Sequence, residues 1–296
     1  MKRRNFLETT FGTSIAASFS PSVLALEKRP PRILLRSSWQ TVNIGDIAHT
    51  PGVLAILEKH FPEAEIRLWP SQIGNGVEEI LLARFPKLIV VKHDASLTVA
   101  FARLRYTPYW TIPSKKAVLD HQKRARNDAM KEHDCKPLRD AITAVVKNTE
   151  LKILLCPEVE TQMAVNKEML LDKLPEDIRA RCVWREKYWL TAEALSTYRR
   201  SAGLFGHEMH SPIVCNGNGI PAIVCCWSEQ TSKGIMWRDI GLGDWLFDND
   251  DERKAMPSAV LAMAKDFAAA KAKAAKGREF VEQRQRDMVS VLKMVL

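Results

Sequence analysis

The sequence predicts an α/β protein built on parallel sheets. Short apolar runs alternate with helical patterns along most of the chain, and polar turns follow several of those runs. With 46% hydrophobic and 27% charged residues, the composition is that of an ordinary globular protein. A chain of 296 residues has room for a sizeable core and for about two domains.

The N-terminal part alternates strand and helix. The first helix contains Pro51, which we expect in the first turn, where a missing N–H has no partner to lose. Because parallel neighbours need crossover helices, this pattern predicts a single parallel sheet. The predicted strands are 32–37, 64–69 and 87–92, and the predicted helices are 50–60 and 77–84.

In the middle of the chain, the sequence pattern predicts more helix than strand. Leu138, Ala141, Ile142 and Val145 share one helical face, and Pro157 stops a buried strand. Two helices rich in alanine, lysine and arginine close the chain. The predicted strands are 97–104, 151–156 and 181–184, and the predicted helices are 117–133, 138–147, 161–174, 192–199, 257–275 and 277–292.

Residues 202–248 hold the densest set of candidate functional residues. The segment contains an apolar strand, a turn with two histidines, a short helix closed by glycine, a second apolar strand and a polar loop. Open α/β sheets bind ligands at the carboxyl ends of their strands, where turns of this kind lie. We therefore expect any chemistry to be centred here.

His210 and Ser211 stand at the predicted start of the short helix. Helix-start N–H groups attract negative charge and an imidazole exchanges protons near neutral pH, so we expect an acid/base group or an anion donor. The competing interpretation is a histidine that caps a turn. His207 and His210 are three apart in a turn rather than four apart on a helix, so we predict neither a metal nor a cofactor.

A second candidate site follows the first strand. Asn43, Gly45 and Asp46 form a polar turn that can direct backbone donors toward a ligand, and the carboxylate can act as a base. The competing interpretation is an Asx turn in which these residues cap the next helix. Position along the chain does not choose between the two.

Cations for an anionic ligand are expected from two places. Ser232 and Lys233 lie in a polar loop predicted beyond the second strand of 202–248, and Arg103 and Arg105 stand near the end of another strand candidate. Arginine binds carboxylate or phosphate through two parallel hydrogen bonds, while lysine supplies a point charge. The competing interpretation for each is a surface salt bridge.

Several classes of protein are disfavoured. The net charge of +9 is spread along the chain and interleaved with acids, and no nucleic-acid-binding motif accompanies it. Between Gly76 and Gly203 there is no glycine, so a glycine-rich phosphate loop cannot lie there. None of the six cysteines forms a C-x-x-C pair, and a disulfide scaffold is not expected. The sequence has no run of about twenty apolar residues, so stable membrane insertion is not expected.

Residues 1–25 are interpreted as an export signal. Lys2, Arg3 and Arg4 precede a mildly apolar stretch with a small-residue ending, and the arginine pair followed by Phe-Leu resembles a twin-arginine signal. This predicts an exported, periplasmic protein. The alternative is a frayed basic terminus on a cytoplasmic one.

The motifs together resemble the polysaccharide pyruvyl transferase family. The first match is the N-x-G-D turn at 43–46 with Gly52 beyond it. The second is the H-S-x-I segment at 210–213 followed by Gly219, Pro221 and Ile223. The third is Lys233 in the loop beyond that strand, together with the glycine-rich stretch 241–244.

The resemblance implies a fold and an activity. The fold would be two Rossmann-like domains in a GT-B-like arrangement, with a shortened first domain at 26–96, a second domain at 97–252 and C-terminal helices at 253–296. The activity would be group transfer from phosphoenolpyruvate to a saccharide hydroxyl. His210 would serve as the acid or phosphate-side donor and Asp46 as a base, with Lys233 and Arg103 or Arg105 as the anion clamp.

Two alternative functions remain open from the sequence. One is a non-catalytic protein of this ancestry that binds a glycan or a small anion. The other is a GT-B-like glycosyltransferase that uses a nucleotide sugar.

Overall fold

The computed structural model describes residues 30–38, 40–91, 121–227 and 231–294. The protein is mixed α/β, with 56% helix, 15% strand and small parallel sheets, as the sequence predicted at the level of fold class. The predicted export signal at 1–25 and the strand candidate 97–104, with Arg103 and Arg105, lie outside the described residues.

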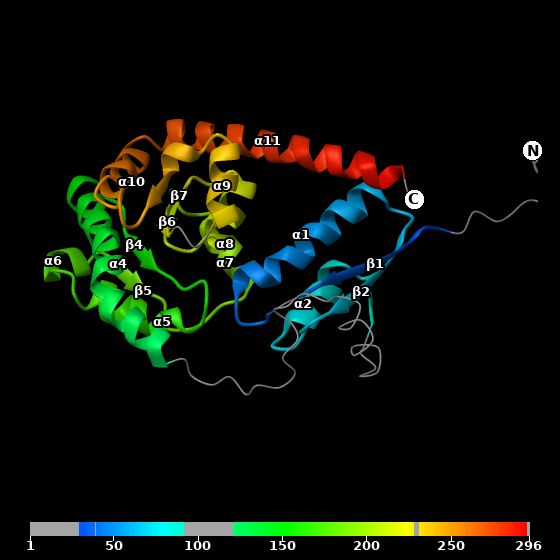
Figure 1. The fold of residues 1–296 in the computed structure, drawn as a ribbon, viewed down its shortest axis with the longest axis horizontal. Helices are drawn as coiled ribbons and strands as arrows, with labels where there is room; N and C mark the ends of the chain where they lie inside the picture. Colours follow the sequence, from blue (N-terminus) through cyan, green and yellow to red (C-terminus); the bar gives the residue numbers. More distant parts are fainter. Residues whose placement is uncertain (1–29, 39, 92–120, 228–230, 295–296) are drawn as a thin grey trace, which may run out of the picture.

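The N-terminal unit contains the predicted parallel sheet. Its strands β1 (Arg32–Ser37), β2 (Glu65–Pro70) and β3 (Ile89–Val90) lie in that order and pair in parallel. Helices α1 (Ile44–His60) and α2 (Val77–Arg84) connect them (Figure 1). Leu54 of α1, Leu68 of β2 and Leu81 of α2 are almost fully buried in one cluster, so both helices cover the same core.

Helix α1 begins earlier than predicted, at Ile44 rather than near Thr50. The reason is its cap, because the side-chain oxygen of Asn43 accepts hydrogen bonds from the N–H groups of Gly45 and Asp46. Pro51 consequently lies inside the helix and not in its first turn, which corrects the prediction.

One long helix, α4 (His121–Asn148), replaces the two helices predicted for its region. Pro137 lies within it, although proline removes a helical hydrogen bond. Ala141 and Ile142, one turn further along, are 0% and 1% exposed, so tertiary packing stabilises the helix despite the proline. The elements that follow are β4 (Ile153–Leu155), α5 (Gln162–Val165), the π-helix η3 (Asn166–Leu171), α6 (Glu176–Arg179) and β5 (Cys182–Trp184).

The strands beyond residue 150 divide into two parallel sheets. Strands β4 and β5 form one pair, and β6 (Leu204–Gly206), β7 (Ala222–Cys226) and β8 (Leu246–Asp248) form the other sheet in that order. Strand β7 is central and its five residues are buried, as expected for a parallel strand covered on both faces. The helices around this sheet are α7 (Thr191–Tyr198), α8 (His210–Gly217), α9 (Thr231–Asp239), the 3-10 helix η5 (Gly243–Trp245), α10 (Met256–Lys265) and α11 (Phe267–Lys293).

The segment around Lys233 was predicted to be a loop, and this prediction is wrong. Residues 231–239 form helix α9, which places the backbone of Ser232 and Lys233 in a first helical turn. Burial of Trp237 explains the difference, because this side chain is 0% exposed and lies in the largest hydrophobic core of the protein.

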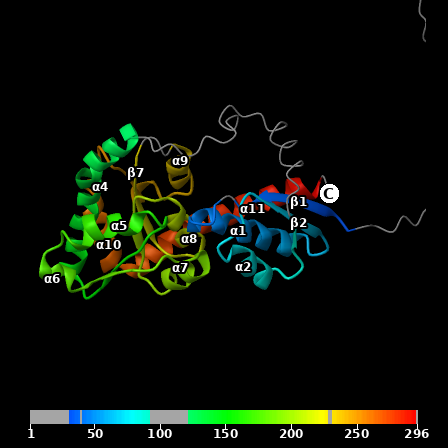
Figure 2. The ribbon, with the colours of Figure 1, turned by 90° about the horizontal axis from the view of Figure 1, so that it is seen from below.

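The N-terminal unit joins the rest of the protein at the start of α1. Figures 1 and 2 show this end of α1 against α7 and α8. The hydroxyl of Thr191, the first residue of α7, donates a hydrogen bond of 2.8 Å to the carbonyl oxygen of Ile44.

Among the described helices, none has the length and apolar composition of a membrane span.

Candidate functional site

His210 is the first residue of α8 and lies shortly after the carboxyl end of β6. Its Nδ1 atom is 2.7 Å from Oε1 of Glu158. The second carboxylate oxygen, Oε2, accepts the N–H of Ser211 at 2.6 Å. The side chain of Glu158 is 2% exposed and that of His210 is 14% exposed. The imidazole is therefore held at Nδ1 by a buried carboxylate, and it keeps limited access to solvent.

Glu158 itself is anchored through its backbone. Its N–H donates to the side-chain oxygen of Gln162 at 3.0 Å, and its carbonyl oxygen accepts the Tyr188 hydroxyl at 3.2 Å and the Ile44 N–H at 3.3 Å. Just before it, the carbonyl oxygen of Pro157 accepts the indole N–H of Trp189, which is 2% exposed. These contacts fix the direction in which the carboxylate leaves the chain.

Sequence reasoning missed Glu158. The available signal was an acidic residue directly after the proline that ends a buried strand, at the edge of the parallel sheet where ligands bind. That proline was interpreted only as a stop signal. Fifty-two positions separate Glu158 from His210, and local patterns do not encode such a pairing.

Gly45 brings the two predicted motifs together. A β-carbon placed on Gly45 would lie 2.1 Å from Cβ of His210, so α1 approaches α8 as closely as only glycine allows. One turn along α1, the ring of His49 meets that of His210 edge to face, with centroids 5.7 Å apart. The N-x-G-D turn and the His-Ser helix start are therefore neighbours in space.

Within that turn, Asn43 caps helix α1 and Asp46 lies in its first turn. The Oδ1 atom of Asn43 accepts the N–H groups of Gly45 at 2.8 Å and of Asp46 at 3.3 Å, which is the Asx-type cap. Asp46 stands in the first turn, where a carboxylate favours the helix dipole. Burial raises the pKa of Tyr188, with smaller contributions from Glu158, Glu160 and Asp46.

Ser211 is 5% exposed and its polar groups are engaged. Its N–H bonds to Glu158 and its hydroxyl oxygen accepts the Tyr198 hydroxyl at 3.2 Å. Burial raises the pKa of Tyr198, which keeps that hydroxyl protonated. The sequence predicts an external anion at this helix start, but the N–H of Ser211 already donates to the Glu158 carboxylate, so an anion would have to bind elsewhere around His210.

The predicted cations are not placed against His210. The side chains of Ser232 and Lys233 and the whole of Arg103 and Arg105 lie outside the described residues. A groove shared by His210 and Lys233 therefore stays a prediction. Among the described residues, no cluster of three or more histidine, cysteine or acidic side chains has the geometry of a metal site.

His207 has a different environment from His210. Its Nε2 atom is buried, and its ring lies 4.9 Å from the ring of Trp227, which follows β7. Burial lowers the pKa of His207 to about 4, against a smaller opposing effect of Asp134. A histidine that stays neutral over most of the pH range suits a structural role at this sheet edge.

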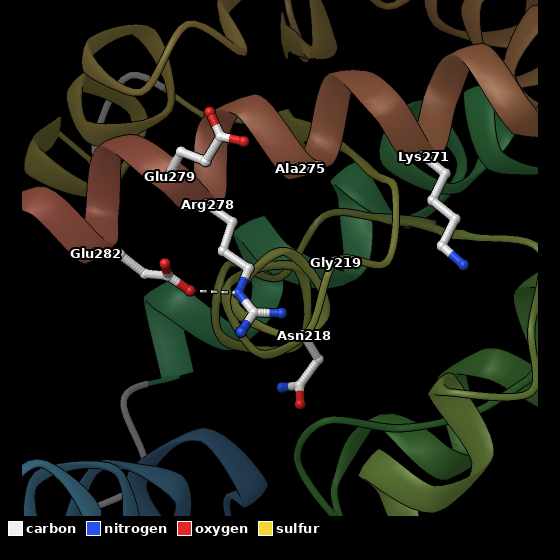
Figure 3. Close-up of a pocket in the computed structure, with 7 residues that line it drawn as sticks. All are labelled: Asn218, Gly219, Lys271, Ala275, Arg278, Glu279 and Glu282. Atoms are coloured by element: carbon white, nitrogen blue, oxygen red, sulfur yellow. Dashed lines mark hydrogen bonds and ion pairs between the residues drawn. The ribbon is translucent and has the colours of Figure 1, made fainter. Parts of the chain in front are cut away.

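A shallow surface pocket of about 330 Å³ lies at the opposite end of α8 (Figure 3). It is formed by the turn at Asn218 and Gly219 and by one face of α11. The figure shows Arg278 turned toward Glu282, whose Oε1 atom is 2.9 Å from its Nε, while Lys271 stands apart. An exposed pair of this kind contributes about 0–1 kcal/mol and makes no convergent binding group.

The site therefore consists of His210 and its carboxylate Glu158, with the Gly45 turn of α1 packed against the imidazole. Such a group can exchange a proton with a bound molecule. Compared with known proteins, the chain matches no protein-family model and no curated protein.

Proposed function

We propose that this protein transfers the pyruvyl group of phosphoenolpyruvate to saccharide hydroxyls and forms a ketal. The observation that carries the proposal is the close contact of Gly45 with His210, because it joins the two motifs on which the family resemblance rests. Either motif alone is a common turn. Their meeting at one imidazole is what a shared site requires.

The chemistry assigns one task to each group. The methylene carbon of phosphoenolpyruvate gains a proton from His210 and becomes a methyl group. Two saccharide oxygens bond to the adjacent carbon, the bond from that carbon to the phosphate oxygen breaks, and phosphate leaves. Of the two hydroxyl protons, one replaces the proton that His210 gave and the other leaves with phosphate. Asp46 would act as the base that takes this second proton and passes it to the departing phosphate.

The environment of His210 supports the acid/base role. With Nδ1 bonded to Glu158, exchange with a substrate falls to Nε2 of the same ring. Lys233, with Ser232 and with Arg103 or Arg105, would hold the donor carboxylate and phosphate. Asn43 and Gly45 would line the acceptor side through the backbone of their turn.

The proposal includes the larger arrangement and the location. Two Rossmann-like domains in a GT-B-like arrangement, the first shortened, would face each other across the substrates, and the N-terminal signal would send the protein to the periplasm. The variant Arg3→Lys with Arg4→Lys, followed by cell fractionation, tests the second point. An unchanged distribution of the protein would exclude twin-arginine export.

Phosphate release is the direct test of the reaction. The purified protein is incubated with phosphoenolpyruvate and a mixture of glycans, alongside His210→Ala and the control His60→Ala at the far end of α1. We expect release with the wild-type protein and with His60→Ala, and none with His210→Ala. Absence of release from the wild-type protein, over a range of glycans, would refute pyruvyl transfer.

A second candidate function is binding without turnover. It is favoured by Glu158, whose carboxylate occupies the Ser211 amide where a phosphate group was expected. Calorimetry that detects glycan or phosphate binding, without phosphate release, would select this function. Thermal stabilisation by a nucleoside diphosphate, but not by phosphoenolpyruvate, would instead select a glycosyltransferase.

A further inference from the structure

We propose that Glu158 is the positioning residue of this site and holds His210 in the tautomer that carries its proton on Nδ1. The inference rests on the proposed function for its catalytic meaning. Its structural content concerns this protein alone and is measured without any substrate.

The first step of the argument is hydrogen-bond chemistry. A carboxylate is only an acceptor, so its two oxygens must both face donors. One oxygen faces the N–H of Ser211 at 2.6 Å and the other faces Nδ1 of His210 at 2.7 Å. In a neutral imidazole, Nδ1 must then carry the proton, which leaves the ring's lone pair on Nε2.

The second step is rigidity. Glu158 is 3% exposed, and its backbone is tied to Gln162, Tyr188 and Ile44. On the other side of the imidazole, Gly45 leaves no space for the ring to move toward α1. A buried carboxylate with both oxygens engaged and an anchored backbone cannot rotate away without losing a hydrogen bond worth about 1.5–3 kcal/mol.

A purely structural role must be distinguished from positioning. Helix α8 has no side-chain cap of its own, because Met209 at the cap position makes no such bond. Glu158 therefore also caps α8 from another part of the chain. A glutamine at this position separates the roles, because its amide oxygen can still accept the Ser211 N–H while its NH₂ group then faces Nδ1 and can only donate.

The experiment compares the wild-type protein, Glu158→Gln and the control Glu160→Gln, an exposed glutamate two residues away. Nitrogen-15 NMR of histidine-labelled protein reads the tautomer, because the protonated and bare ring nitrogens have widely different shifts. The His210 signals are assigned by their loss in His210→Gln. Steady-state kinetics with phosphoenolpyruvate and an accepted glycan provide the second readout.

We expect the wild-type protein and Glu160→Gln to carry the proton on Nδ1, and Glu158→Gln to carry it on Nε2. We also expect kcat of Glu158→Gln to fall on the order of 100-fold or more with little change in KM, because the protonated ring that donates from Nε2 also needs an acceptor for its Nδ1–H, and the glutamine NH₂ group can only donate. A wild-type spectrum with the proton on Nε2 overturns the proposal, and so does an unchanged tautomer in Glu158→Gln.

The two proposals fail separately. Lack of turnover by the wild-type protein refutes pyruvyl transfer, while the spectra still decide the role of Glu158. If Glu158→Gln does not fold, the wild-type spectrum alone decides. Wild-type kcat in a folded Glu158→Gln protein would show that the carboxylate only caps α8, and would overturn the positioning role.

Discussion

Gly45 of α1 lies against His210 of α8 so closely that an added β-carbon would come within 2.1 Å of the histidine Cβ and 2.2 Å of its Cγ. Nonbonded carbon atoms prefer separations of about 3.5–4.0 Å. The only way to accept a larger residue at position 45 is to move one of the two helices. This contact joins the N-terminal unit to the candidate site.

The first prediction concerns Gly45→Ala. Alanine favours a helix over glycine by about 1 kcal/mol, but overpacking costs about 1–3 kcal/mol and here it meets a β-carbon, not the end of a flexible chain. We expect the free energy of unfolding to fall by about 1–2 kcal/mol, toward the upper end of this balance, measured by urea denaturation. Gly52→Ala in the same helix meets nothing within 4 Å and should raise it by about 0.5–1 kcal/mol. Equal effects of the two substitutions would contradict the close contact.

The second prediction concerns pH. Burial lowers the pKa of His207 from 6.5 to about 4, so the unfolded chain binds a proton at a pH where the folded protein does not. Stability is therefore full above pH 6.5 and declines as pH falls toward 4, by up to about 1.4 kcal/mol per pH unit and roughly 3 kcal/mol in total.

The variant His207→Gln isolates this effect. It should lower stability near neutral pH because the contact with Trp227 is lost, yet flatten the decline between pH 6.5 and 4. Urea denaturation at half-unit pH steps measures both curves. Parallel curves for the variant and the wild-type protein would show that His207 is not the group responsible.

The third prediction concerns the thiols. All six cysteines are free, and burial raises the pKa of Cys135 and of Cys156 to about 11 and that of Cys225 to about 12. Because the thiolate is the reactive form, labelling of the native protein with a disulfide reagent at pH 8 should be slow. Cys182 in the short strand β5 is partly exposed and should react first.

Cys182→Ser provides the matched variant for this assay. It should remove the earliest phase of labelling, and urea should then release five reactive groups in place of six. An early phase that persists in Cys182→Ser would mean that another thiol is the accessible one.

The fourth prediction concerns Lys233 and depends on the proposed function. Loss of an ammonium group from the donor site removes a charged hydrogen bond worth about 1.5–3 kcal/mol, so Lys233→Ala should raise KM for phosphoenolpyruvate about 10-fold or more. Lys254→Ala, at an exposed position, is the control. An unchanged KM in Lys233→Ala would remove this residue from the anion clamp.

Local pattern determined much of the secondary structure. The strand at 32–37 and the helix at 77–84 have the bounds that were predicted, because apolar spacing and flanking turn residues are properties of neighbouring positions. The Asx turn at Asn43 was also among the interpretations of the sequence. The candidate His210 at the start of a short helix after an apolar strand was confirmed in position, though not in function.

Tertiary structure decided what local pattern could not. Helix α4 continues past Pro137 because Ala141 and Ile142 are packed in the core. Residues 231–239 form α9 and not a loop because Trp237 is buried. In both places burial outweighs the local conformational preference. The strands of the C-terminal part pair into two sheets. Most of all, only the fold could bring Glu158 and Gly45 to His210, since contacts between residues far apart in the chain depend on how whole elements pack and not on the residues beside them.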